Sequence, residues 1–194
     1  MAGESIDDDL PPDKVREPRE VAMRAVTLFA AVGAALGAPR EQIVPWLHEH
    51  GLWGELSPAE AMFLTTLSDD RQSRINFGWQ SERLLVLLWA LGKIPNLPRS
   101  DEQCDTGKFQ AILPPYSEST VADFLQGAIL LSEDVLIAKA EELLDQHWQA
   151  RNARITGDPM PQGIDIEIVQ ERHHAINWIT GYCGLPWDEV TTDT

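Results

Sequence analysis

A run of eight consecutive apolar residues, Leu84 to Leu91, constrains the fold of this chain more than any other feature. The run is bounded by Gly92 and Pro95 and contains more Leu and Ala than β-branched residues. Together with the residues just before it, the run is long enough for a helix, although a buried strand is the other structure that such runs form. Because a helix that is apolar on every side has to be buried, residues 79–91 are predicted to form the central helix of the protein.

Helical patterns dominate the rest of the chain. Ser57, followed by Pro58 and then by Glu60 three positions after the serine, is a capping box, which marks the start of a helix. The other helices are predicted from apolar residues at helical spacing and from glycine and proline at the ends. They cover residues 19–37, 41–50, 120–131, 133–156 and 165–182.

Little else in the sequence has the pattern of regular structure. Residues 93–118 contain four prolines and are expected to form a long irregular connection, with one helical turn near Phe109. Only residues 164–169 show a weak strand-like alternation, and no internal repeat is visible. The predicted fold class is therefore all-α, a single-domain irregular or orthogonal bundle of about six to eight helices.

The first residues differ in composition from the rest of the chain. A length of 194 residues fits one ordinary domain. Residues 1–18 contain four Asp, two Glu and three Pro but few large apolar side chains, so they bury too little surface to offset the entropy of ordering. We therefore predict a disordered acidic tail over residues 1–18 and a single helical domain over residues 19–194.

The chain is strongly acidic, with 31 Asp and Glu against 15 Lys and Arg and a formal net charge of −16. This charge repels phosphate backbones and anionic membranes, so neither nucleic acids nor membranes are expected as partners. It attracts basic proteins and raises the rate at which they associate. With no basic leader, no apolar stretch of about 20 residues and only two cysteines, the protein is expected to be cytoplasmic with reduced thiols.

Five strings of residues, in a fixed order, resemble a known family. They are Leu56-Ser-Pro-Ala-Glu60, the run from Trp79 to Gly92, Cys104-Asp105, Glu171-Arg-His-His-Ala-Ile-Asn-Trp178 and the segment from Trp187 to Thr194. Together they resemble the bacterial family called domain of unknown function 4272, from about residue 19 to the last residue. The resemblance implies a mainly helical cytoplasmic protein and supplies no activity, substrate or catalytic residue.

Ionisable residues on the last long helix, residues 165–182, lie where core contacts are expected. When this helix is projected at about 100° per residue, Arg172 falls in the middle of the apolar face. A guanidinium group at such a position is expected to reach a carboxylate, because an unpaired buried charge is too unfavourable. Glu171 and His174 form a second stripe beside this face, whereas His173 is predicted to point towards solvent.

Two other predicted helices direct polar groups to the same region. On residues 133–156 the inward stripe changes from leucine to histidine and arginine, and the central helix carries a glutamate one turn before its fully apolar section. We therefore predict a partly buried cluster of six candidate site residues, which are Glu82, His147, Arg151, Glu171, Arg172 and His174. Two interpretations stay open: an ion-pair network that fixes the register of the helices, or a site that binds a small anion or transfers protons.

Other kinds of chemistry find little support. Glu171 and His174 form one Glu-x-x-His pattern, whereas carboxylate-bridged di-iron bundles need two such patterns and further glutamates. Neither cysteine has a nearby cysteine partner, and no base is identified for Cys104, so no metal, no cofactor and no nucleophile is predicted.

These observations favour a non-enzymatic acidic interaction protein that binds or inhibits a basic protein partner. The alternative is an enzyme or a binder of small anionic ligands that uses the predicted cluster of ionisable residues. Whether the protein is an enzyme, and which oligomeric state it adopts, stay open from the sequence.

Overall fold

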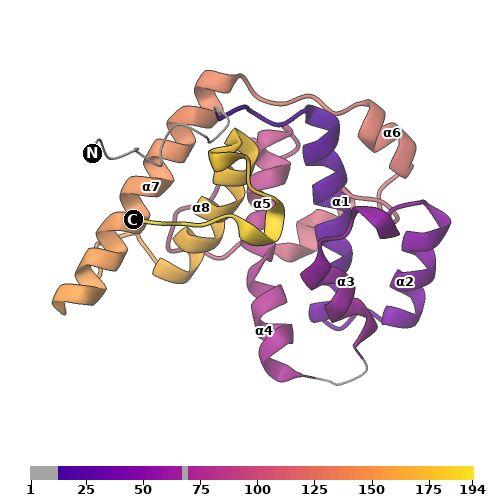
Figure 1. Cartoon of the computed structure of the whole chain (residues 1–194), viewed down its shortest axis with the longest axis horizontal. Helices are drawn as coiled ribbons and strands as arrows, with labels where there is room; N and C mark the ends of the chain where they lie inside the picture. Colours follow the sequence, from indigo (N-terminus) through magenta and orange to yellow (C-terminus); the bar gives the residue numbers. More distant parts are fainter. Residues whose placement is uncertain (1–12, 67–69) are drawn as a thin grey trace, which may run out of the picture.

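The computed structural model describes residues 13–66 and 70–194, and eight α-helices cover this part of the chain (Figure 1). Their bounds are α1 Pro18–Ala35, α2 Arg40–Glu49, α3 Pro58–Thr65, α4 Arg71–Trp79, α5 Ser81–Ala90, α6 Val121–Gln126, α7 Glu133–Thr156 and α8 Ile166–Thr180. Short 3-10 helices lie at η2 Trp53–Glu55, η3 Thr106–Ala111, η4 Tyr182–Gly184 and η5 Trp187–Glu189. The all-α prediction is confirmed, because the described residues form no strand beyond an isolated bridge between Ser100 and Ile164. Among the described helices, none combines the length and apolar composition needed to cross a membrane.

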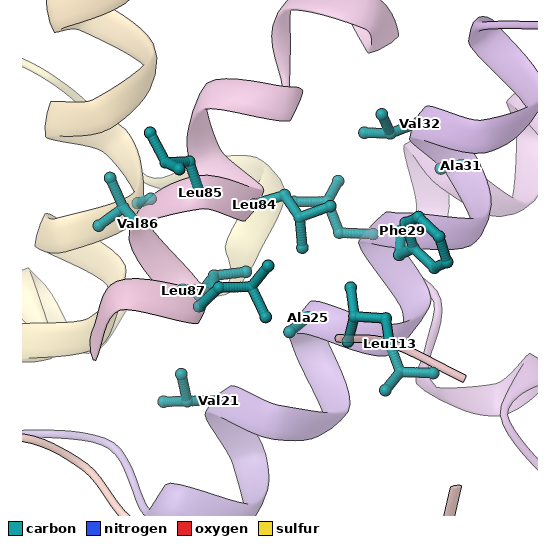
Figure 2. Close-up of a cluster of buried hydrophobic side chains, with 14 of the residues drawn as sticks. Val21, Ala25, Phe29, Ala31, Val32, Leu84, Leu85, Val86, Leu87 and Leu113 are labelled. Atoms are coloured by element: carbon teal, nitrogen blue, oxygen red, sulfur yellow. The ribbon is translucent and has the colours of Figure 1, made fainter. Parts of the chain in front are cut away.

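Helix α5 lies at the centre of the core, as its apolar run predicts. Each residue from Leu84 to Leu91 is at most 7% exposed. Figure 2 shows Leu84 and Leu87 of α5 facing Ala25 and Phe29 of α1. Helix α8 packs against α5 as well. Because α1 and α8 both cover α5, no face of its apolar section is left for solvent, which explains why this section carries no polar stripe.

Several helix ends lie where the sequence marks them. The capping box forms as predicted: the backbone N–H of Glu60 donates to Ser57 Oγ at 3.3 Å, and the backbone N–H of Ser57 donates to Glu60 Oε2 at 2.9 Å. Helix α7 begins directly after Ser132 and is followed by Gly157, whose φ of 76° lies in the left-handed region. The turn predicted near Phe109 is the 3-10 helix η3.

Two elements differ from the predictions. The sequence predicts no separate helix over residues 71–79, yet α4 forms there, because the Asp70 side chain accepts hydrogen bonds from the backbone N–H groups of Gln72 and Ser73. Few residues of α4 are buried, so it lacks the apolar spacing by which the other helices are recognised. Helix α6 ends at Gln126 and not at residue 131.

The predicted acidic tail is wrong for residues 13–18: residues 13–17 lie against the end of α8, and Pro18 begins α1. The residues before them lie outside the described part of the chain. The backbone N–H of Arg16 donates to the Ile179 carbonyl at 2.9 Å. Its guanidinium donates to the carbonyls of Trp178 and Leu185, at 2.8 and 2.6 Å, and lies 4.4 Å from the centre of the Trp178 ring. These polar contacts, together with the packing of the partly buried Val15 against the core, compensate the ordering of this segment.

Candidate functional site

Helix α8 holds three of the six predicted site residues and is buried on nearly every side. It packs against both α5 and α7, and 11 of its 15 residues are buried (Figure 1). His173 is 2% exposed, so the prediction that it points towards solvent is wrong. The helical projection identifies the face that meets α5, but α7 covers the other side, and the pattern of one helix cannot reveal a second neighbour.

Glu82 of α5 and Arg172 of α8 form a buried ion pair, which confirms that Arg172 reaches a carboxylate. Arg172 Nε donates to Glu82 Oε2 at 2.8 Å, and both side chains are at most 2% exposed. The remaining guanidinium nitrogens donate to backbone carbonyls of the irregular connection, including those of Pro98 at 2.8 Å and Glu102 at 2.9 Å. Glu82 Oε1 accepts from the backbone N–H of Cys104 at 2.6 Å. The pair therefore ties this connection to two core helices.

The thiol of Cys104 lies beside this ion pair. Burial raises the pKa of Cys104 to about 12, and the neighbouring Glu82 carboxylate acts in the same direction. A thiol with this pKa stays protonated at neutral pH, and a protonated thiol is a weaker nucleophile than a thiolate.

Glu171 and His174 are joined through Arg83, which the sequence analysis did not single out. Arg83 Nε forms an ion pair with Glu171 Oε2, and Arg83 Nη1 lies 3.0 Å from His174 Nε2. Burial, together with the charge of Arg83, lowers the pKa of His174 to about 2, so its imidazole is neutral and accepts this hydrogen bond. The His174 ring also contacts the edge of Trp187, with ring centres 4.9 Å apart.

His147 of α7 faces His173 of α8, and their Nδ1 atoms are 3.1 Å apart. Burial lowers the pKa of both imidazoles, that of His173 to about 4, so one neutral ring donates and the other accepts. Arg151 was expected in the same partly buried cluster, but it is exposed and donates to Thr194 Oγ1 at 3.1 Å. That expectation is wrong because Arg151 lies towards the outer side of α7, one turn beyond His147.

The structure therefore brings five of the six predicted residues into three separate groups around α8 and leaves Arg151 outside them. In each group the charged or polar side chains bind one another. These groups join α8 to α5, through the pairs of Arg172 and Glu171, and to α7, through His173. Within the described residues, no three His, Cys, Asp or Glu side chains gather closely enough to hold a metal ion.

A further buried ion pair, Arg24 of α1 with Glu60 of α3, was missed by the sequence analysis. Their side chains are 6% and 1% exposed, and Arg24 also donates to Thr27 Oγ1 at 2.5 Å. Burial raises the pKa of Glu60, although the Arg24 charge acts in the opposite direction. One signal that could have indicated the pair is the single arginine within the apolar stretch of residues 20–37.

Arg24 lines a groove of about 680 Å³. The groove lies where the start of α1, the start of α3 and the segment around η5 meet, and the rings of Trp178 and Trp187 form part of its walls. Three guanidinium groups line it, those of Arg16, Arg19 and Arg24. The carboxylates that line it are those of Glu17, Glu20, Glu55, Asp188 and Glu189.

The model of one family, described as Domain of unknown function (DUF4272), matches residues 6–190. No curated protein and no solved structure matches the chain. Since the matched region covers nearly the whole sequence, the chain belongs to the DUF4272 family.

Proposed function

We propose that this protein is a non-enzymatic interaction protein that binds a Lys- and Arg-rich segment of a protein partner in the groove between α1, α3 and η5. The observation that carries this proposal is the composition of the groove, in which five carboxylates and two tryptophan rings surround a volume of about 680 Å³. The guanidinium groups of Arg16 and Arg24 already lie 4.4 and 5.2 Å from the centres of the Trp178 and Trp187 rings, so the carboxylates are the groups that pair with a partner's cationic side chains.

The pairing of the groove residues leaves mainly negative charge available to a ligand. Arg16 is paired with Glu20, and Arg24 with a carboxylate behind the groove wall. Among the described residues, the exposed side chains of Glu55 and Glu189 have no ion-pair or hydrogen-bond partner, which leaves them available to a partner's cations. Arg19 is the exposed cation at this rim.

The net charge of the whole protein also favours binding of a basic partner. At −16, it attracts a basic partner over distances set by the Debye length, about 10 Å at 0.1 M salt. Such attraction raises association rates and weakens as salt is added. Binding in the groove should therefore be fast and strongly dependent on ionic strength.

The test is isothermal titration calorimetry with a short Lys- and Arg-rich peptide. The site variant is the double substitution Glu55→Lys/Glu189→Lys. The matched control is Glu49→Lys/Glu118→Lys, which makes the same change in net charge at exposed residues outside the groove. We expect the site variant to bind the peptide about tenfold more weakly than the control does. Equal affinities of the two variants would show that the peptide senses only the net charge, and the proposal would be wrong.

A second candidate function, binding of a small anion at the floor of the groove, is favoured by one observation. Arg24 is 6% exposed, and its Nε has no hydrogen-bond partner among the described residues. Thermal unfolding in rising inorganic phosphate tests this candidate. Saturable stabilisation that is lost in Arg24→Lys supports it, whereas equal stabilisation of both proteins indicates a general salt effect. The six-residue cluster predicted from the sequence is not proposed as this site, because Glu82 and Arg172 pair with each other, Glu171 pairs with Arg83, and Arg151 lies outside these groups.

A further inference from the structure

Helix α7 has one face in the core and a second apolar face in solvent. The core face consists of Leu136, Leu143, His147, Ala150 and Ala153, which are all buried. The exposed face carries four large apolar side chains that are between 42% and 78% exposed, namely Ile137, Leu144, Trp148 and Ile155. Figure 1 shows that the C-terminal turns of α7 extend beyond α8, and Trp148 and Ile155 on these turns are 51% and 78% exposed.

The spacing of these side chains matches a helix-pairing surface. They follow one another at intervals of 7, 4 and 7 residues, which places them within about 20° of one line along the helix. Glu141 and Arg151 occupy the two remaining positions of a heptad pattern, about 40° to either side of this line, and both are exposed. We call the surface formed by Ile137, Glu141, Leu144, Trp148, Arg151 and Ile155 the outer stripe of α7.

The outer stripe is symmetric about Gln146. Each member has a counterpart the same number of residues away on the other side, which gives the pairs Ile137 with Ile155, Glu141 with Arg151 and Leu144 with Trp148. In antiparallel helix pairs related by a two-fold axis, residues equidistant from the centre lie at the same level on opposite helices. We propose that the outer stripe binds the outer stripe of a second copy of this chain, antiparallel, to form a symmetric dimer.

The charges of α7 favour this antiparallel orientation. Residues 133–145 contain five acidic residues and one lysine, whereas residues 146–156 contain two arginines and no acidic residue. An antiparallel pair places the acidic half of each helix beside the basic half of the other, and a parallel pair would place like charges together. At the centre of each half, Glu141 of one copy meets Arg151 of the second copy.

A cavity beside the acidic half of the outer stripe also supports a second copy of this chain as the partner. It has a volume of about 360 Å³, and its lining includes Ile137 and Leu144 together with the carboxylates of Asp13, Glu133, Glu141 and Asp193. The described lining contains no lysine or arginine. In the antiparallel pair, the basic half of the second copy approaches this cavity and supplies the missing positive charge.

The size of the outer stripe sets the expected strength of the dimer. The stripe extends for about 27 Å along the helix, at about 1.5 Å per residue, which makes a small interface. Two copies that each carry a net charge of −16 also repel one another. We therefore expect a dimer that forms reversibly at micromolar concentrations and becomes tighter as salt is added. This salt dependence is opposite to that expected for a basic peptide in the groove, so the two proposals succeed or fail separately.

Sedimentation velocity over a concentration series, at low and at high salt, tests the proposal. We expect Leu144→Ala/Trp148→Ala to weaken self-association at least about tenfold. Val135→Ala is the matched control, since Val135 is 44% exposed on the same helix but points away from the outer stripe. Its association should equal that of the wild type. A wild-type chain that stays monomeric at all concentrations would overturn the proposal, as would equal effects of the two variants.

A charge exchange then tests the orientation and the identity of the partner. Glu141→Arg and Arg151→Glu should each weaken the dimer, because like charges meet across the interface. The double variant Glu141→Arg/Arg151→Glu should restore association to near the wild-type value. Circular dichroism of each variant checks that α7 is retained. If the double variant associates no better than the single variants, or if Arg151→Glu alone strengthens binding, the antiparallel self-pair is wrong.

Discussion

Arg172 is the residue whose surroundings best explain how α8 is held. Its guanidinium satisfies the Glu82 carboxylate and several backbone carbonyls at once, while the side chain is 1% exposed. A buried ion pair of this kind contributes little net stability compared with well-packed apolar residues, but losing one partner leaves an uncompensated charge in the core. Replacing one partner alone should therefore reduce stability more than replacing both partners together.

Arg172→Met should destabilise the protein by about 3–5 kcal/mol, because the Glu82 carboxylate stays buried without its partner. The double variant Glu82→Gln/Arg172→Met should recover much of this loss, since the amide oxygen of the introduced glutamine still accepts from the backbone N–H of Cys104 and carries no charge. Urea unfolding followed by circular dichroism measures both. A double variant that is less stable than Arg172→Met would contradict the idea that an unpaired charge causes the loss.

His173 should make the stability of the protein depend on pH. Its pKa is about 4 in the folded chain because of burial, against about 6.5 in the unfolded chain. As the pH falls from 6.5 towards 4, the unfolded chain takes up a proton that the folded chain refuses, so stability is lost across this window by up to about 1.4 kcal/mol per pH unit. His147 acts in the same direction.

Urea unfolding of the wild type and of His173→Gln between pH 6.5 and about 4 checks this expectation. The variant should show a shallower fall in the free energy of unfolding, because one of the buried imidazoles has been removed. Parallel curves would mean that His173 takes up its proton equally in both states.

At the scale of elements, α7 and α8 end in the same way and differ in what lies beyond the end. Both are followed by a glycine with positive φ, Gly157 at 76° and Gly181 at 79°. A Cβ atom on Gly157 would meet nothing within 4 Å, whereas one on Gly181 would overlap the Lys14 carbonyl oxygen. Gly181 thus ends α8 and also admits the segment of residues 13–17.

This difference gives a matched pair of variants. Gly157→Ala should destabilise the protein by about 1 kcal/mol, from the left-handed conformation alone. Gly181→Ala should cost at least about 1 kcal/mol more, because the backbone at Lys14 has to move. Urea unfolding measures the loss, and limited trypsin digestion should cleave after Lys14 or Arg16 faster in Gly181→Ala than in Gly157→Ala. Equal stabilities and cleavage rates would mean that the 13–17 segment is not held at Gly181.

At the scale of the whole molecule, the excess of negative charge opposes folding while it attracts cations. The net charge of −16 arises because acidic residues outnumber basic ones about two to one in the chain. Several of the ion pairs that involve arginine are buried or half-buried, as at Arg24, Arg83 and Arg172, where added salt screens them only weakly.

Added salt should therefore stabilise the dilute protein. Between about 0.02 and 0.2 M sodium chloride, the Tm should rise by a few degrees, because screening weakens repulsion between exposed carboxylates more than it weakens the buried pairs. Differential scanning fluorimetry at low protein concentration measures this change without a contribution from self-association. A Tm that falls over the same range would show that exposed ion pairs dominate the electrostatics of folding.

The sequence predicted the fold well and the candidate site only in part. The burial of Leu84–Leu91, the capping box at Ser57 and the extent of α7 follow from patterns within a few turns of chain, and all three are confirmed. The carboxylate partner expected for Arg172 was also found. In contrast, Arg83 was overlooked and His173 was placed in solvent, because the neighbours of both side chains lie on helices that are distant in sequence.

The sequence alone was enough to establish an acidic all-α protein with α5 at its centre. Helical spacing and caps are properties of neighbouring residues, and net charge is a property of the composition, so none of them requires the tertiary structure. The grouping of ionisable residues around α8 was established by packing alone. Glu82 and Arg172 are 90 positions apart, and the groove at Trp187 combines residues from both ends of the chain. The sides of a helix that are covered depend on which neighbours pack against it, and a local pattern contains no information about distant neighbours.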